Sequence, residues 1–243
     1  YTPAGMQFWP AANALYLKET ADNYPGARAI MNVCYEGLQL PIDLALKVES
    51  RYFAHVLQTK EAAAMIRSLF VSMQDLNKGA RRPADVPASN LKKVAIVGAG
   101  FMGAGIAYVS AKAGLDVVLI DRDQAAADKG KAYSVDLTGK DVAKGRLTKE
   151  KQDALLARIH PTANYAALAD CDLVVEAVFE DRQVKKDVTE TIEKHLKKGA
   201  IFASNTSTLP ITSLAENSKA PKNFIGIHFF SPVDKMMLVE IIM

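Results

Sequence analysis

The chain has 243 residues, of which 49% are hydrophobic, and its formal net charge is +3. This length and apolar content suffice for one large domain or two small ones. The basic residues are scattered, pairs such as Arg81–Arg82 are too short for a patch, and no apolar run approaches the length of a membrane span, so nucleic-acid binding and a transmembrane segment are not expected.

Residues 1–77 are dominated by helical spacing. We predict a helix opened by Pro25, a second opened by Pro41 and a third over positions 63–73. Helices of this size make a poor core alone, so we expect their apolar faces to dock on the rest of the chain or on a further domain. Residues 78–91 are polar, with prolines and a glycine, and are predicted to be a linker.

From residue 92 onward, strand and helix signals alternate, which predicts a mostly parallel sheet with helices on both faces. The strand-like runs are 93–97, 117–121, 172–178, 200–204 and 224–229. The helical stretches fall at about 101–113, 123–143, 148–157, 182–197 and 210–216. The predicted fold class is therefore α/β, a doubly wound sheet over 92–243 that follows an all-helical segment.

The first strand-like run ends in Gly98-x-Gly100-x-x-Gly103, and Asp121 ends the second run, eighteen residues past the last glycine. Gly98 permits a tight turn, Gly100 lets the backbone approach a pyrophosphate, and Gly103 lets the following helix pack close to the strand. The helix N-terminus would hold the phosphates. Asp121 would bind the ribose hydroxyls and repel a 2′-phosphate. This pattern predicts a Rossmann-type site that prefers NAD to NADP; the alternative is a tight turn without a ligand.

Ligands of such sheets bind beyond the carboxyl ends of the strands. The polar residues that directly follow the later strand-like runs are therefore candidate ligand contacts. Ser207 follows the fourth run and is placed to serve a ligand. Thr208 is better explained as a cap of the helix that Pro210 opens. Lys185 begins a helix and is either a ligand contact or a solvated helix charge.

His228 lies near the end of the last run, and Glu240 follows twelve residues later inside an apolar segment. Burying that carboxylate is costly unless it is paired, and pairing with the imidazole would fix the tautomer of His228 and raise its basicity. Two interpretations stay open: a catalytic pair and an uncharged core imidazole. The other histidines fall in predicted helices or loops and need no special role: His55, His160 and His195.

Cys34 and Cys171 are far apart and lie in apolar stretches, so we predict buried free thiols in a reducing compartment. The chain starts at Tyr1 without a Met and stops at Met243, directly after a strand-like run. We therefore expect a fragment of a longer polypeptide.

Five motifs occur in order: Gly-Ala-Gly-Phe-Met-Gly, Val-Val-Leu-Ile-Asp, Val-Val-Glu-Ala-Val-Phe-Glu, Ala-Ser-Asn-Thr-Ser-Thr and His-Phe-Phe-Ser-Pro. Through them, residues 91–243 resemble the L-3-hydroxyacyl-CoA dehydrogenases of fatty-acid β-oxidation. Residues 1–90 resemble the segment before the dehydrogenase in multifunctional β-oxidation enzymes of the fatty-acid oxidation complex α-subunit type. There, helices close off an enoyl-CoA hydratase part and lead into a linker.

The resemblance implies NAD-dependent oxidation of L-3-hydroxyacyl-CoA to 3-ketoacyl-CoA, in a parent that is also an enoyl-CoA hydratase. It makes His228 the general base, Glu240 the acid that orients it, and Ser207 a contact of substrate oxygen and nicotinamide. The implied cofactor contacts are Gly98, Gly100, Phe101, Met102, Gly103, Asp121, Val178, Phe179, Glu180, Lys185, Ser207 and Ser231. The helical stretch around Ser134 and Lys140 resembles an arm that meets CoA.

Two departures from the family stand out. Ser231 replaces an asparagine of many members, and the family continues into a helical C-terminal domain with an active-site asparagine, most of the acyl pocket and the main subunit interface. The hydratase glutamates are also absent from this chain. The alternatives are therefore an NAD-binding fragment without turnover and another hydroxyacid dehydrogenase with the same glycine loop.

The partners that the resemblance implies are an acyl-CoA thioester and, for the full-length parent, a thiolase subunit and an oligomeric state. No metal site and no nucleic-acid partner are predicted. The expected location is the cytoplasm of a bacterium, with the mitochondrial matrix as the alternative.

Overall fold

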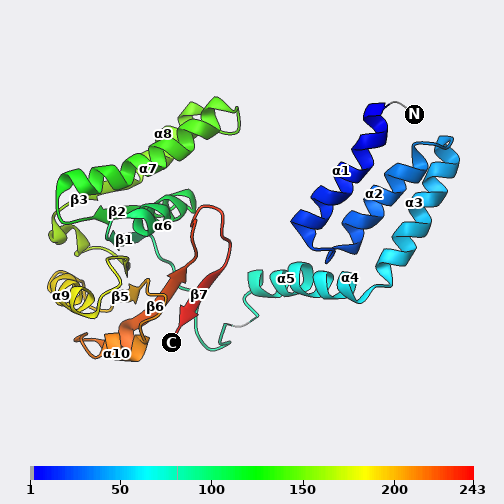
Figure 1. Ribbon diagram of the computed structural model, residues 1–243. Helices are drawn as coiled ribbons and strands as arrows, with labels where there is room; N and C mark the ends of the chain where they lie inside the picture. The colour runs from blue at the N-terminus through cyan, green and yellow to red at the C-terminus, as the bar shows by residue number, and fades with distance from the viewer. Residues whose placement is uncertain (1–2, 81) are drawn as a thin grey trace. The chain divides into compact units, whose positions relative to one another are not determined.

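The computed structural model describes residues 3–80 and 82–243, so Arg81 of the basic pair lies outside the described residues. Its contacts divide the chain into two compact units, Tyr1–Ala88 and Ser89–Met243. The first unit is helical, and the second is a sheet flanked by helices (Figure 1). None of the helices in the described ranges is long and apolar enough to cross a membrane.

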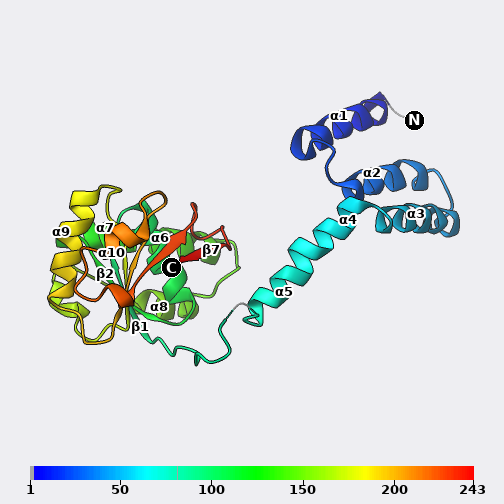
Figure 2. The ribbon, with the colours of Figure 1, turned by 90° about the horizontal axis from the view of Figure 1, so that it is seen from below.

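Unit 1 contains the three predicted helical regions and one that was not predicted. The elements are α1 (Pro3–Thr20), α2 (Pro25–Gly37), α3 (Ile42–Leu57), α4 (Lys60–Met65), a π-helical turn (Ile66–Val71) and α5 (Ser72–Asn77). Pro25 opens α2 and Pro41 caps α3, as the sequence predicts. The segments from α4 to α5 form one rod (Figure 2). The missed helix, α1, carries Pro10 in its interior.

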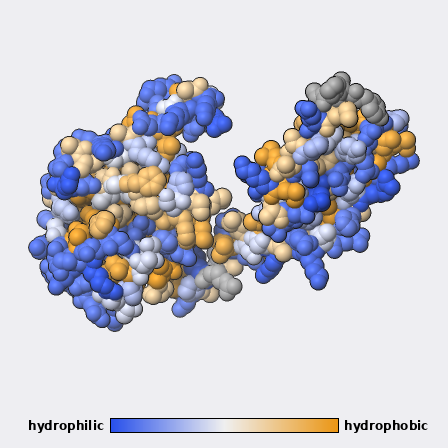
Figure 3. All heavy atoms as spheres, in the orientation of Figure 1, coloured by the Kyte–Doolittle hydropathy of each residue, from blue (hydrophilic) through white to orange (hydrophobic). Residues whose placement is uncertain are grey.

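The core of unit 1 is thin. Among its described residues, the buried hydrophobic side chains are Tyr16, Ala29 and Val48. Large apolar side chains such as Leu38 and Ile42 are exposed, and hydrophobic residues gather on the surface of this unit (Figure 3). That the apolar faces dock on another domain stays a prediction.

Cys34 corrects one prediction, because its thiol is exposed rather than buried. Helix α2 packs against α3, and on α2 the side chain of Ala29 is buried and that of Val33, four residues later on the same face, is half-buried. Cys34 follows Val33 directly and so lies on a different face of the helix. A two-helix contact buries only one stripe of each partner. The prediction holds for Cys171, which is a buried free thiol in unit 2.

Unit 2 is built on a seven-stranded sheet of order β3-β2-β1-β4-β5-β6-β7. The strands are β1 (Lys93–Val97), β2 (Asp116–Ile120), β3 (Ile159–Thr162), β4 (Leu173–Glu176), β5 (Ile201–Ser204), β6 (Phe224–Phe229) and β7 (Val239–Ile242). All neighbouring pairs are parallel except β6 and β7, which are antiparallel. This confirms the predicted doubly wound α/β fold. The strand order reverses between β1 and β4, where such sheets bind ligands.

Two sequence expectations about strands differ from the structure. The run predicted over 172–178 is shorter, since β4 ends at Glu176. Strand β3 was missed, and His160 therefore lies on a strand rather than in a helix or loop. It is an edge strand that contains Pro161, and edge strands tolerate proline because one side of their backbone needs no partner.

The helices of unit 2 cover both faces of the sheet (Figure 2). They are α6 (Phe101–Lys112), α7 (Gln124–Ala143), α8 (Lys149–Ala157), α9 (Arg182–Glu193) and α10 (Ile211–Ala215). Alternate residues of each strand point to opposite faces, so Ile96 joins the cluster that contains α6 residues and Val97 joins the cluster of α9 and α10. Helix α9 ends four residues before the predicted position 197, in tighter turns that bond Lys194 and His195 to carbonyls three residues back.

Candidate functional site

The glycine loop between β1 and α6 uses its three glycines in different ways. Gly98 has φ +100°, and a Cβ there would lie 2.7 Å from the carbonyl oxygen of Ala177. A Cβ on Gly103 would lie 1.7 Å from the carbonyl oxygen of Gly98. In contrast, a Cβ on Gly100 would meet nothing within 4 Å. The fold itself therefore requires Gly98 and Gly103, whereas Gly100 faces open space that a phosphate group fits at the helix N-terminus.

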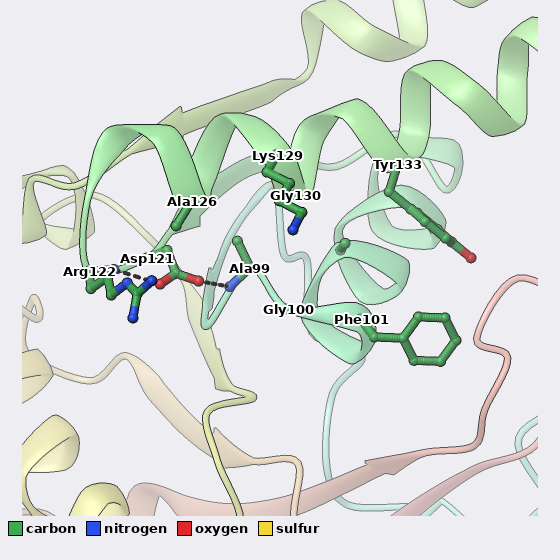
Figure 4. A pocket seen from close by; sticks show the side chains of 10 residues that line it. Ala99, Gly100, Phe101, Asp121, Arg122, Ala126, Lys129, Gly130 and Tyr133 are labelled. Atoms are coloured by element: carbon green, nitrogen blue, oxygen red, sulfur yellow. Dashed lines mark hydrogen bonds between the residues drawn. The ribbon is translucent and has the colours of Figure 1, made fainter.

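Asp121 stands just beyond β2, and its carboxylate is tied to this loop (Figure 4). One oxygen accepts a 2.7 Å hydrogen bond from the N–H of Ala99, and the other accepts one of 2.7 Å from the N–H of Arg122. The carboxylate lines a cavity of about 520 Å³ together with Gly100, Phe101 and residues of α7. Its position fits the predicted ribose contact.

Helix α7 forms one wall of this larger cavity. A Cβ on Gly130 would lie 2.6 Å from the Cβ of Ala99, so α7 packs directly on the glycine loop. The rings of Phe101 and Tyr133 meet edge to face at 6.3 Å. Tyr133 in turn donates a 3.1 Å hydrogen bond to Asp234, which lies in the loop between β6 and β7.

A second cavity, of about 290 Å³, lies at the carboxyl ends of the later strands. Residues from four separate segments meet there. Predicted site residues that line it are Met102, Val178, Glu180, Ser207, His228 and Ser231. Phe179 is not in this lining and is 79% exposed. The structure thus gathers residues that lie up to 129 positions apart between Met102 and Ser231.

His228 and Glu240 form the predicted pair. They are register partners on β6 and β7, and Nδ1 of His228 lies 2.8 Å from Oε2 of Glu240. The side chain of His228 is 18% exposed and lines the second cavity, with the ring of Phe230 at 4.5 Å. The geometry contradicts the interpretation of His228 as a core imidazole, because the ring has a carboxylate partner and reaches a cavity.

Glu180 organises the loop that carries Ser207. Its Oε1 accepts hydrogen bonds from the hydroxyl of Thr206 at 2.5 Å and the N–H of Ser207 at 3.0 Å. Burial alone would raise the pKa of Glu180, but the Thr206 hydroxyl and the charge of Lys185 outweigh it and lower the pKa to about 2. Thr208 also turns toward Glu180 instead of capping α10, whose N-cap is Pro210, so the predicted cap is wrong.

Lys185 is not a solvated helix charge. Its side chain is 1% exposed, and Nζ lies 2.9 Å from Oε1 of Glu176 and 3.2 Å from Oε2 of Glu180. Lys185 is therefore a buried ion-pair partner of both glutamates. That it also contacts the cofactor directly stays a prediction. Sequence reasoning missed Glu176, although a glutamate inside an apolar strand run is a signal, since a buried carboxylate needs a partner.

The two residues named for the predicted CoA-binding arm, Ser134 and Lys140, differ in exposure. Ser134 on α7 is fully buried, so its own side chain does not reach the surface, and the contact of the surrounding helical stretch with CoA stays a prediction. Ser134 lies on the inward face of α7 with Thr138, which accepts a hydrogen bond from Gln152 of α8. Lys140 is exposed, and its contact with CoA stays a prediction.

Among the described residues, no group of three or more metal-ligating side chains could hold a metal ion.

Comparison with known proteins places these features in one family. A family model described as "3-hydroxyacyl-CoA dehydrogenase, NAD binding domain" matches residues 93–243. A fatty acid oxidation complex subunit alpha of Psychrobacter cryohalolentis is 38% identical over 237 residues, covering 98% of this chain and 33% of its own length. The corresponding subunit of Pseudomonas entomophila is also 38% identical, with the same coverage. The chain thus spans about a third of the length of the curated relatives that it matches.

Solved structures agree with this relationship. An (S)-3-hydroxybutyryl-CoA dehydrogenase of Ralstonia eutropha is 39% identical with a TM-score of 0.61, over 63% of this chain and 54% of that protein. A 3-hydroxybutyryl-CoA dehydrogenase of Escherichia coli is 36% identical with a TM-score of 0.61, over 63% and 32% of the two chains. The chain therefore belongs to the NAD-binding domain family of the 3-hydroxyacyl-CoA dehydrogenases.

Proposed function

We propose that this chain is the coenzyme-binding part of an enzyme that oxidises L-3-hydroxyacyl-CoA to 3-ketoacyl-CoA with NAD. One observation carries the proposal: His228, which is paired with Glu240, lines a cavity together with Ser207 and with Met102 of the glycine loop. A proton acceptor and a hydroxyl donor thus stand beside the predicted dinucleotide site. Oxidation of an alcohol requires a base that takes the hydroxyl proton and a dinucleotide that takes the hydride.

The residues at the switch point fit NAD. The open space at Gly100 and the N-terminus of α6 suit the pyrophosphate, and the carboxylate of Asp121 suits the ribose hydroxyls. Of the two cavities, the larger lies on the Asp121 side and takes the adenosine half, which leaves the cavity of His228 for the nicotinamide half. Bound NAD supplies the acceptor for the hydride that leaves C3 of the substrate.

The protein groups would then handle the proton. Glu240 accepts the Nδ1–H of His228, which leaves Nε2 as the basic nitrogen that takes the proton of the substrate 3-hydroxyl. The same carboxylate stabilises the imidazolium that results. The hydroxyl of Ser207 donates a hydrogen bond to the substrate oxygen as it becomes a ketone. Glu180 keeps Ser207 in place by accepting its backbone N–H.

For the full-length protein, we propose the wider setting that the curated relatives' name indicates. They are subunits of a fatty acid oxidation complex, which supports an acyl-CoA substrate, an enoyl-CoA hydratase part, a thiolase subunit as partner and an oligomeric state. These relatives are bacterial, which supports a location in bacterial cytoplasm. Residues 1–77 would belong to the hydratase part, with 78–91 as the linker to the coenzyme-binding domain.

The length of the match favours a second candidate, in which the chain alone binds NAD without turnover. The chain covers 33% of the length of its curated relative from Psychrobacter cryohalolentis. If other segments of the full-length protein bind the acyl group of the substrate, the chain alone lacks that part of the site. An assay with acetoacetyl-CoA and NADH, on the 243-residue chain and on a full-length relative, separates the two. Turnover by the chain alone would exclude the second candidate. NAD binding without turnover, beside an active full-length protein, would support it.

A CoA-thioester titration tests the substrate class separately. Failure of the full-length protein to bind any CoA thioester while it still binds NAD would overturn the acyl-CoA assignment. That result would favour another hydroxyacid dehydrogenase with the same glycine loop.

A further inference from the structure

Three charged side chains, two of them buried and the third in the lining of the second cavity, form an ion-pair group. Glu176 ends β4, Lys185 lies on α9, and Glu180 lies between them in the chain. Nζ of Lys185 is 2.9 Å and 3.1 Å from the two oxygens of Glu176, and 3.2 Å from Oε2 of Glu180. The side chains of Glu176 and Lys185 are each 1% exposed, and that of Glu180 is 34% exposed. We call these residues the acidic triad.

The hydrogen bonds determine the charge of each member. Glu176 accepts from the N–H of Val178 at 2.8 Å, from the hydroxyl of Ser204 at 2.7 Å and from Lys185. Every one of these contacts uses a carboxylate oxygen as acceptor, which is the pattern of the ionised form. Lys185 has carboxylate oxygens as its partners, as an ammonium requires. The pKa of Glu180, lowered to about 2, keeps that group ionised at neutral pH. The triad therefore carries one net negative charge.

The surroundings of the triad do not cancel this charge. Glu180 lines the second cavity with Ser207 and His228, and no Lys or Arg is among the residues described as its lining. His228 also lines this cavity, and its partner Glu240, which is not a lining residue, has a carboxylate oxygen 2.8 Å from Nδ1 of the imidazole. No Lys or Arg in the lining therefore opposes the negative charge of Glu180, and charges that are buried or partly buried are weakly screened by salt.

We propose that the acidic triad makes the site discriminate between the two redox states of its coenzyme, favouring NAD⁺ over NADH. The inference rests on the proposed function, which places the nicotinamide half in this cavity. The nicotinamide ring is cationic in the oxidised form and neutral in the reduced form, so only the oxidised form is attracted by the triad. Glu176 acts here through space, as an electrostatic positioning residue that does not line the cavity.

The charge difference changes the relative binding free energies of the two coenzyme forms. The attraction between triad and ring vanishes when hydride arrives, because the ring becomes neutral. The triad therefore stabilises the complex with the oxidised coenzyme and gives no such stabilisation to the complex with the reduced one. The same difference opposes reduction of the bound coenzyme, because the attraction is lost when the ring becomes neutral.

The test measures the dissociation constants of NAD⁺ and NADH for the 243-residue chain by calorimetry. Glu176→Gln keeps the shape of the side chain and removes one negative charge. We expect the ratio Kd(NADH)/Kd(NAD⁺) to fall about tenfold, the size that Coulomb's law gives for a unit charge about 12 Å from the ring at an effective dielectric constant near 20. Glu180→Gln removes a charge from the partly exposed member and should lower the ratio in the same direction, even where Glu176→Gln does not fold.

Ser204→Ala is the matched control, because it deletes a hydrogen bond to Glu176 and leaves every charge in place. Its ratio should equal that of the parent chain. A purely structural triad would weaken both forms equally in the charge variants, and an unchanged ratio in Glu180→Gln would overturn the inference. Binding of neither form by the parent chain would instead overturn the proposed function, and the inference with it.

Discussion

His228 and Glu240 face each other across the antiparallel pair of β6 and β7, with Nδ1 and Oε2 2.8 Å apart. This pair of strands is the antiparallel one in an otherwise parallel sheet of the described residues. The chain reverses direction after β6 and brings the carboxylate back beside the imidazole at the ligand-binding edge. The reversal is therefore what supplies the histidine with its partner.

Replacing the imidazole tests its proposed role. His228→Gln in a full-length protein should lower oxidation of 3-hydroxyacyl-CoA by about 10²- to 10⁴-fold, the usual contribution of a general base. NAD affinity should stay near the parent value, because Gly100 and Asp121 line the other cavity. Steady-state rates and NAD titration provide the two readouts. Equal losses in both would indicate a structural histidine instead.

Asp121 is expected to set the choice of coenzyme. Asp121→Ala should weaken NAD binding and reduce discrimination against NADP, since the carboxylate that repels a 2′-phosphate is lost. Asp121→Asn serves as the matched variant, because an amide can still accept the hydrogen bond from the N–H of Ala99. Titrations with both coenzymes measure the preference. An unchanged NAD-to-NADP ratio in both variants would contradict the role of Asp121.

The glycine loop offers a comparison between a ligand role and a packing role. Gly100→Ala should leave the melting temperature near the parent value, because its Cβ meets nothing within 4 Å, and should weaken NAD binding by obstructing the pyrophosphate. Gly103→Ala should lower the melting temperature markedly, since its Cβ would lie 1.7 Å from a backbone oxygen. Thermal unfolding and NAD titration distinguish the two. The assignment fails if Gly100→Ala binds NAD as tightly as the parent chain.

The two thiols should react very differently. Cys34 is exposed, whereas burial raises the pKa of the Cys171 thiol to about 11. At pH 8, iodoacetamide should modify Cys34 within minutes and leave Cys171 intact until denaturant is added. Mass spectrometry of the peptides reports each site. Cys34→Ser is the control, and rapid modification of the remaining thiol in that variant would show that the core around Cys171 opens.

Glu180 should contribute to acid sensitivity. Its folded pKa of about 2 lies below the ordinary value of 4.5, so its stabilisation is fully present above pH 4.5 and is lost as the pH falls toward 2. The parent chain should therefore lose more unfolding free energy over this window than Glu180→Gln does. Urea unfolding at several pH values measures the difference. Parallel pH profiles for the two proteins would show that the lowered pKa of Glu180 does not stabilise the fold.

Much of the fold is predictable because its signals are local. The strand-like run at 224–229 coincides with β6, and the glycine pattern marks the turn from β1 into α6. Local patterns fail where the structure depends on partners. Strand β3 is short and contains Pro161, so it shows no alternation, and it becomes a strand only by pairing with β2. The sequence pattern also missed α1.

The residues of the site divide in the same way. The sequence alone determined the chemical types and their order: the glycine loop, Asp121, and a histidine followed by a carboxylate. Tertiary structure alone decided that Lys185 is buried between Glu176 and Glu180, and that Ser134 faces inward. The physical reason is that burial and ion pairing depend on elements far apart in the chain, which periodicity within a single helix cannot reveal.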